Sequence, residues 1–269
     1  MNQPKEIALN YLCVAKAKTT MTWYKIFVLA VLAGAFIALG GALSCFASAG
    51  FSGTQASLIK GAVFPLGLIL VVICGAELFT GNCLLIAPVM SKEVKVTGML
   101  KNWGLAYIGN FAGAVMIAAL VVGSHLFGAT AASISPSGLA CIATAAAKCN
   151  AGFGDIFLRG ILCNMLVCLA VWAAMASKSA GGKILAVYMP VFAFVVCGFE
   201  HSIANMYYLV SGLTASAMYG LPAAGLNFGN ALAYCLIPST LGNIIGGALI
   251  ALAYFTVYFR GNKPPQNAD

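Results

Sequence analysis

Long apolar segments alternate with short polar segments along nearly the whole chain. Stretches of about 20 apolar residues, the length at which a helix spans the hydrocarbon core of a bilayer, recur six times. They begin near Ile26, Gly61, Met99, Ile156, Ile184 and Leu232. Because these stretches occupy most of the length, the loops between them are short and no separate water-soluble domain is expected. The pattern predicts an all-α integral membrane protein with six transmembrane helices.

The composition agrees with this pattern. Only 7% of the 269 residues are charged and 62% are apolar, whereas a soluble domain carries about 25% charged residues. So few charges cannot cover a surface that faces water. The first apolar run starts only after Lys25 and is longer than the apolar region of a typical signal peptide. We therefore expect a retained membrane span at this position.

The basic residues are distributed unevenly between the two sets of loops. Of the 14 Lys and Arg residues, only Lys60, Lys148 and Arg159 fall on one predicted side of the membrane, and the rest fall on the other. The positive-inside rule then places both termini in the cytoplasm and the chain in the cytoplasmic (inner) membrane. The net charge of +8 is explained mostly by the basic residues in the loops on the cytoplasmic side. With no basic domain, nucleic acid is not an expected partner.

Three parts of different character follow one another along the chain. Residues 1–22 are expected to form a cytoplasmic amphipathic helix that lies along the membrane surface. Its apolar residues are Ile7, Tyr11, Val14 and Ala15, and its basic residues are Lys5, Lys16 and Lys18. Residues 23–260 form the six-span membrane domain. Residues 261–269 are expected to be a disordered cytoplasmic tail.

Two short motifs occur twice. GAELFTGN (75–82) and GFEHSIAN (198–205) share the pattern G-x-E-x-x-x-x-N at an offset of 123 residues, and GNFAGA (109–114) matches GNIIGG (242–247). Each half of the chain then contains three spans. Because three is odd, the second half enters the membrane from the opposite face, which gives an inverted repeat of three plus three with a pseudo-two-fold axis in the membrane plane.

The matched octets interrupt the second and fifth helices. Gly, Asn and Thr favour breaks and caps over helix interiors, and a broken helix at membrane depth requires backbone that is buried in protein or lines a polar cavity. The second part of each broken helix begins near the membrane centre with its partially positive N-terminus. The breaks therefore predict a pathway whose centre favours an anion.

One histidine lies at the second break. Ionisable residues inside a membrane are usually functional, and His201 can donate a hydrogen bond when neutral or a proton when charged, since imidazole titrates near about 6.5. Thr80, at the equivalent break of the first half, offers a hydroxyl that would orient this imidazole or the ligand.

The other polar residues of the octets suit a scaffold. Glu77 and Glu200 occupy equivalent positions, and a carboxylate in an anion pathway would repel the cargo. We expect both to accept hydrogen bonds from free N–H groups at the breaks, a role that Asn82 and Asn205 also suit. Lys148 lies in a predicted outer loop. It is either a solvated loop cation or a group that concentrates anions at the mouth, and the residues alone leave both interpretations open.

The ten cysteines do not indicate a metal or redox site. Most lie inside spans, where cysteine behaves as a small hydrophobic residue, and neither a CxxC motif nor a Cys/His ligand spacing is present. With only His125 and His201, no bis-histidine haem pair is evident, and no nucleotide motif is found. No cofactor, metal site or enzyme activity is expected. Cys141 and Cys149, in the outer loop, are the one pair that would allow a disulfide.

The six spans, the inverted repeat, ELFTGN in span 2 and GFEHSIANM in span 5 resemble the formate/nitrite transporter family over roughly residues 5–260. The resemblance implies a homopentamer in the lipid bilayer whose aquaporin-like protomers each contain a pore. The expected cargo is a small monovalent anion of a weak acid: formate, nitrite or hydrosulfide, and in some branches acetate or lactate. The TGN triplet and the many cysteines are compatible with the hydrosulfide-conducting branch without deciding it.

The resemblance also implies roles for particular residues. His201 would be the central pore histidine and Thr80 its partner. Two apolar constrictions would flank them, with Phe64 and Phe194 on the outer side and Leu68, Leu78 and Phe79 on the inner side. The vestibule lysine matches Lys148, with Asn164 in span 4 as its polar companion, and the span-5 asparagine matches Asn205. None of these positions departs from the family pattern.

An unpaired charge in an apolar slit is costly, which leaves two routes for the anion. In the first route, the positive helix ends and His201 hold the anion. In the second route, the anion takes up a proton and crosses as a neutral acid, and this second route is the working hypothesis. A neutral-solute channel of the water or glycerol type is the alternative function, but its paired Asn-Pro-Ala motifs are absent. A purely structural membrane protein would leave His201 and both breaks unexplained.

Overall fold

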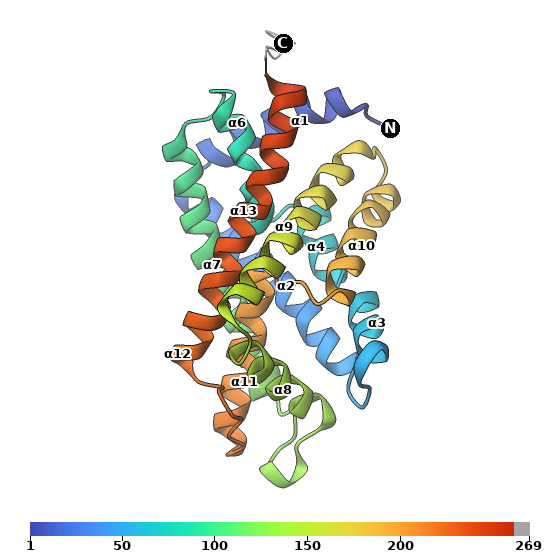
Figure 1. Cartoon of the computed structure of the whole chain (residues 1–269), viewed down its shortest axis with the longest axis vertical. Coiled ribbons are helices and arrows are strands. Elements are labelled where there is room, and N and C mark those ends of the chain that lie inside the picture. The colour runs from blue at the N-terminus through green and yellow to red at the C-terminus, as the bar shows by residue number, and fades with distance from the viewer. Residues whose placement is uncertain (261–269) are drawn as a thin grey trace.

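The computed structural model describes residues 1–260, and every regular element in this range is a helix (Figure 1). The first half contains α1 (Pro4–Thr20), α2 (Trp23–Ala47), α3 (Gly53–Val63), α4 (Leu66–Cys74), α5 (Phe79–Asn82), η1 (Cys83–Leu85), α6 (Ile86–Met90) and α7 (Val96–Gly123). After the short turn η2 (Ala131–Ser133), the second half contains α8 (Pro136–Cys149), α9 (Phe153–Ala176), α10 (Ala180–Val196), α11 (Ser202–Tyr219), α12 (Phe228–Asn230), η3 (Ala231–Leu236), α13 (Ile237–Tyr254) and η4 (Phe255–Phe259). The tail predicted at 261–269 lies outside the described residues.

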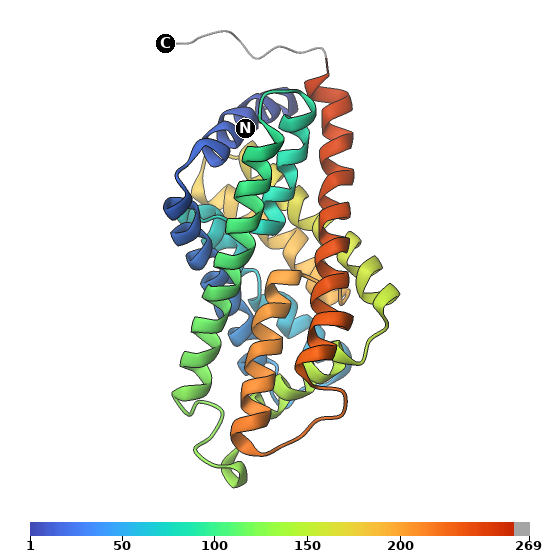
Figure 2. The ribbon, with the colours of Figure 1, turned by 90° about the vertical axis from the view of Figure 1, so that its left-hand side faces the viewer.

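The predicted crossings are present as helices of one bundle. Five segments are long and apolar enough to span a membrane: Trp23–Ala47, Gly53–Cys74, Val96–Gly123, Phe153–Ala176 and Phe228–Phe259. The remaining crossing, which is the fifth along the chain, is shared by α10 and α11, on either side of a break. Helix α1 and the C-terminal end of α13 lie at the same end of the bundle (Figures 1 and 2), as an even number of crossings requires.

The repeated unit contains one helix in addition to the three crossings that the sequence pattern indicated. Helix α1 precedes the first three crossings and α8 precedes the second three. The two helices lie at opposite ends of the bundle (Figure 1). Each carries a lysine in its last turn, Lys18 in α1 and Lys148 in α8. The inverted repeat therefore extends to the polar helices at its two ends.

Helix α1 packs against the bundle with only part of its predicted apolar face. Ile7, Tyr11 and Ala15 are buried, but Val14 is 38% exposed. Lys18 was predicted on the polar face, and this prediction is wrong: its ammonium group turns inward to a carboxylate. At the other end of the bundle, Cys141 and Cys149 lie on the same helix, and both are free thiols.

The second repeated motif supplies the closest helix contacts. A Cβ added at Gly113 of α7 would overlap the carbonyl of Val31 in α2, and one added at Gly246 of α13 would overlap the carbonyl of Ile161 in α9. Small residues at such positions let two helix backbones approach closely, which is how helices associate within a membrane. The sequence match between 109–114 and 242–247 thus identifies two helix pairs, α2 with α7 and α9 with α13, that are equivalent in the inverted repeat.

Gly113→Ala is expected to destabilise the protein by roughly 1–3 kcal/mol, because the added methyl forces α2 and α7 apart. Gly104→Ala is the matched control, since it lies on the same helix and a Cβ there meets nothing within 4 Å. Unfolding in mixed detergent micelles measures both variants. Equal unfolding free energies for the two variants would contradict the assigned helix contact.

Candidate functional site

Both broken helices break in the same way. Gly75 ends the first part of one with φ +74°, and Gly198 follows the first part of the other with φ +69°. This left-handed conformation favours glycine because a Cβ is sterically disfavoured there. The next N–H turns back to the preceding helix, from Ala76 to the Val71 carbonyl at 3.0 Å and from Phe199 to the Phe194 carbonyl at 2.9 Å.

Two buried asparagines join the broken helices to their neighbours. The Asn110 Oδ1 accepts the Phe79 N–H at 3.0 Å, and its Nδ2 donates to the carbonyls of Ala30 and Glu77. Asn243 repeats this pattern: its Oδ1 accepts the Ser202 N–H at 2.9 Å, and its Nδ2 donates to the carbonyls of Gly160 and Glu200. Both asparagines lie in the repeated motif GNFAGA/GNIIGG, but the sequence analysis predicted no role for them.

The two glutamates accept hydrogen bonds from side chains and not from the backbone of the breaks. Glu77 binds the Lys18 ammonium at 2.7 Å and the Asn82 Nδ2 at 2.7 Å. The prediction that the glutamates accept free backbone N–H groups is therefore corrected, since Asn110 holds the Phe79 N–H at this break. Asn102 adds a further donor to Glu77 at 3.0 Å.

The second half repeats this cluster with Glu200. Its carboxylate binds the Lys148 ammonium at 2.6 Å and the Asn205 Nδ2 at 2.9 Å. Lys148 also lies over the Tyr208 ring, 5.6 Å from its centroid. Burial lowers the pKa of the Lys148 ammonium on α8, and the charge and hydrogen bond of Glu200 raise it, with a net pKa above the ordinary value. Lys148 is therefore a partly buried, charged partner of Glu200.

Asn164, which the resemblance gave as the polar companion of Lys148, makes its hydrogen bonds elsewhere in the described structure. Its Nδ2 donates to the Thr80 carbonyl at 3.1 Å and to the Asn243 carbonyl at 2.6 Å. Asn164 thus ties the first break to the second half of the protein from within α9. The polar partner of Lys148 is Glu200 instead.

The predicted contact between Thr80 and His201 is confirmed. The Thr80 Oγ1 and the His201 Nε2 are 2.9 Å apart, and both residues are buried. His201 is also the N-cap of α11, where its Nδ1 accepts the Ala204 N–H at 3.0 Å. Because Nδ1 is an acceptor, the proton of the neutral imidazole lies on Nε2 and is donated to Thr80.

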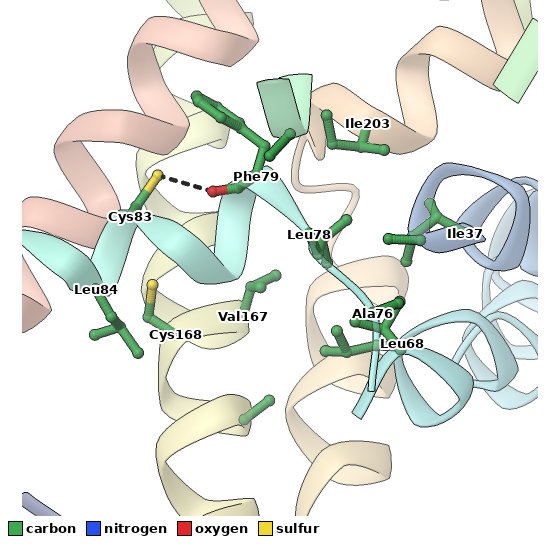
Figure 3. Close-up of a cluster of buried hydrophobic side chains, with 14 of the residues drawn as sticks. Ile37, Leu68, Ala76, Leu78, Phe79, Cys83, Leu84, Val167, Cys168 and Ile203 are labelled. Carbon is green, nitrogen blue, oxygen red and sulfur yellow. Dashed lines mark hydrogen bonds between the residues drawn. The ribbon is translucent and has the colours of Figure 1, made fainter. Parts of the chain in front are cut away.

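Apolar side chains flank this contact on both sides. The Phe194 ring stacks on the His201 ring at 6.0 Å between centroids, and the Phe64 ring meets Phe194 edge-on at 5.9 Å. On the other side, Leu68 and Leu78 lie in one buried cluster (Figure 3). The Phe79 ring points away from Leu68 and packs against the Tyr107 ring at 5.0 Å.

Two cavities approach the histidine from opposite ends and share no lining residue. The α1-side vestibule, of about 480 Å³, is lined by Lys18, Leu68, Glu77, Leu78 and Asn82, among others. The α8-side vestibule, of about 200 Å³, is lined by Phe64, Lys148, Phe194, Glu200, His201 and Asn205, among others. His201 therefore lies at the base of the smaller cavity, next to the apolar barrier between the two.

The inverted repeat is visible in these linings. Gly75, Ala76, Glu77, Leu78, Gly81 and Asn82 line the α1-side vestibule. Their equivalents at the offset of 123 residues, Gly198, Phe199, Glu200, His201, Ala204 and Asn205, line the α8-side vestibule. Each octet forms the floor of its own vestibule. The clearest chemical difference between the two floors is that His201 stands where the first half has Leu78.

Two opposed vestibules built from one repeated unit, with broken helices meeting between them, are the architecture of an aquaporin-like membrane channel. The chain belongs to the formate/nitrite transporter family, whose sequence profile, described as Formate/nitrite transporter, matches residues 5–257. It is thus a multi-pass membrane protein of a transport family and not an enzyme.

Similar proteins agree with this assignment. A probable formate transporter of Methanothermobacter thermautotrophicus is 36% identical over 274 residues, which cover 96% of this chain and 97% of that protein. A solved pentameric formate channel with formate bound superposes with a TM-score of 0.77 at 33% identity, over 88% of this chain and 97% of that one. An aquaglyceroporin from Plasmodium falciparum, at 18% identity over 88% of this chain and 97% of its own, has a TM-score of 0.52 and shares the fold alone.

Proposed function

We propose that the protein is a channel for small monovalent anions of weak acids, with formate as the first candidate cargo. The single observation that carries this proposal is the buried His201–Thr80 pair, 2.9 Å apart, between two vestibules that are each lined by two lysines. The similarity to formate channels supports the choice of cargo. Nitrite and hydrosulfide are the other members of the same chemical class.

The anion would reach the centre through polar vestibules and cross an apolar barrier there. Phe64 and Phe194 line the α8-side vestibule with His201, and Leu68 and Leu78 line the α1-side vestibule, whereas the Phe79 ring packs against Tyr107 and lines neither. A charged formate in this barrier is heavily penalised, because the apolar side chains cannot replace its hydration. Formic acid has no charge to desolvate. We infer that the cargo crosses together with a proton.

His201 has two ways to assist this step. Its Nε2–H, now directed at Thr80, is a hydrogen-bond donor for an anion that displaces the hydroxyl. It can also relay a proton, provided that the imidazole first takes up a proton from a vestibule: the imidazolium then gives a proton to the anion and returns to its neutral form. The Nδ1 acceptor at the N-terminus of α11 keeps the resting imidazole neutral, since a second proton on Nδ1 would lose the helix cap. Asn164 and Asn205 hold the surrounding backbone and carboxylate in place.

The assembly and orientation follow from the same family assignment. We propose a homopentamer in the cytoplasmic membrane, with a pore in each protomer, as in the pentameric formate channel that this chain resembles. Both termini would face the cytoplasm because most Lys and Arg residues lie in the loops on that side. The α1-side vestibule is then the inner mouth and the α8-side vestibule the outer mouth.

Flux in proteoliposomes tests the function. Purified protein should accelerate the entry of formate, nitrite and hydrosulfide at acidic external pH more than at neutral pH, because proton supply promotes each entry. Chloride, whose conjugate acid is too strong to form, should not enter, and lactate tests the upper size limit. Rapid glycerol entry without anion entry would overturn the proposal in favour of the neutral-solute alternative.

A further inference from the structure

A second pair of lysines is related by the inverted repeat. The interval from Lys60 to Glu77 is the same 17 residues as the interval from Lys183 to Glu200. Lys60 lies in the last turn of α3, and Lys183 lies near the start of α10, so each precedes the break of its own half. Both side chains are half-buried.

The two lysines line different vestibules. Lys60 belongs to the α8-side vestibule, together with Lys148 and Glu200. Lys183 belongs to the α1-side vestibule, together with Lys18 and Glu77. Each mouth therefore contains two ammonium groups and one carboxylate. The repeat thus places the same charges at both mouths.

The pairing of these charges differs. Lys18 and Lys148 are held at 2.7 and 2.6 Å from their carboxylates, so each deep pair has little net charge. Within residues 1–260, no hydrogen bond or ion pair engages the ammonium group of Lys60 or Lys183. The net charge of +1 at each mouth therefore resides on the second lysine.

We propose that Lys60 and Lys183 are the residues that concentrate the anionic cargo in the outer and the inner vestibule, respectively. An unpaired cation in a mouth with low-dielectric walls raises the local concentration of anions. Neither residue reaches the His201–Thr80 contact, so the lysines act on capture and not on the crossing step. This inference rests on the proposed function, because it assumes that the cargo arrives as an anion.

Lys60→Gln should raise the formate concentration for half-maximal entry from the outside by roughly two- to five-fold at low salt, the effect of one unit charge at vestibule distance. The difference should vanish when the ionic strength rises from about 10 mM to about 1 M, since the Debye length falls from about 30 to about 3 Å. Intact cells present the outer mouth to formate. Everted membrane vesicles present the inner mouth, where Lys183→Gln should have the same effect and Lys60→Gln none.

Matched variants separate charge from packing. Lys60→Arg keeps the charge and should behave as wild type, whereas Lys60→Met removes the charge and keeps the aliphatic stem. Lys178→Gln is the surface control, because Lys178 is exposed and lines neither vestibule. If Lys60→Gln fails to assemble, the comparison of Lys60→Met with Lys60→Arg carries the test.

The outcomes distinguish this inference from the proposed function. If wild type carries no formate, the proposed function fails. If wild type carries formate but the charge-removing variants show unchanged half-saturation, or a change that persists at high salt, the capture role of these lysines is overturned. A lower maximal rate with unchanged half-saturation would overturn it as well, because that result indicates a packing role.

Discussion

His201→Asn is expected to lower proton-linked formate flux by at least about 100-fold, the scale of a lost proton-transfer group. Asparagine is a strong N-cap residue, so its Oδ1 can accept the Ala204 N–H that the His201 Nδ1 accepts now. The variant therefore keeps the start of α11 while it loses the titratable group. Formate entry and internal pH, recorded together in proteoliposomes, give the two fluxes.

Two controls isolate the histidine chemistry. His125→Asn changes the other histidine, which is exposed and has a positive φ of 58° that asparagine tolerates well. It should leave both fluxes unchanged. Thr80→Ser keeps the hydroxyl that contacts the His201 Nε2 and should also conduct. If wild type moves formate without any linked proton flux, and His201→Asn does the same, the proton-relay role of His201 is refuted.

Glu200→Gln should destabilise the protein by up to about 3–5 kcal/mol, because it leaves the largely buried Lys148 ammonium without its carboxylate. The two charges are 2.6 Å apart, and their side chains are only 15% and 8% exposed. Unfolding of the purified protein in mixed detergent micelles measures the loss. The double variant Lys148→Met/Glu200→Gln removes both charges and should recover most of the stability.

An exposed ion pair of similar length is the matched control. Lys16 and Glu93 are 2.7 Å apart, but their side chains are 50% and 24% exposed. Glu93→Gln should therefore cost no more than about 1 kcal/mol. Equal losses in Glu93→Gln and Glu200→Gln, or a double variant no more stable than Glu200→Gln, would show that burial of the Lys148–Glu200 pair has no special effect.

The repeated motifs predicted much of the architecture. Apolar segments of spanning length marked the crossings, and the shared spacing of Gly, Glu and Asn marked both breaks, because these features are local and occur twice. The alignment of the two halves placed Thr80 at the break equivalent to that of His201, and the family resemblance paired the two residues, whose side chains are 2.9 Å apart. The aquaporin-like fold and the family agreed with that reading.

Other features depend on packing between distant segments. A lysine on an amphipathic helix reads as a surface residue, so the pairing of Lys18 with Glu77 was missed. Asn102 carried a usable signal, since a polar residue inside an apolar span is usually functional. The partner of Asn164 was assigned wrongly because sequence does not show which way a buried amide points. The direction of the Phe79 ring could not be predicted either, because it is set by packing against the Tyr107 ring.

The proton-to-formate stoichiometry of the wild-type channel tests the central claim most directly. Formate is added outside proteoliposomes at zero membrane potential, and internal formate and internal pH are followed in the same sample. Because the barrier around His201 penalises the bare anion, the prediction is one proton entering with each formate and no net charge movement. Formate entry that generates a membrane potential, without matching acidification, would contradict the account.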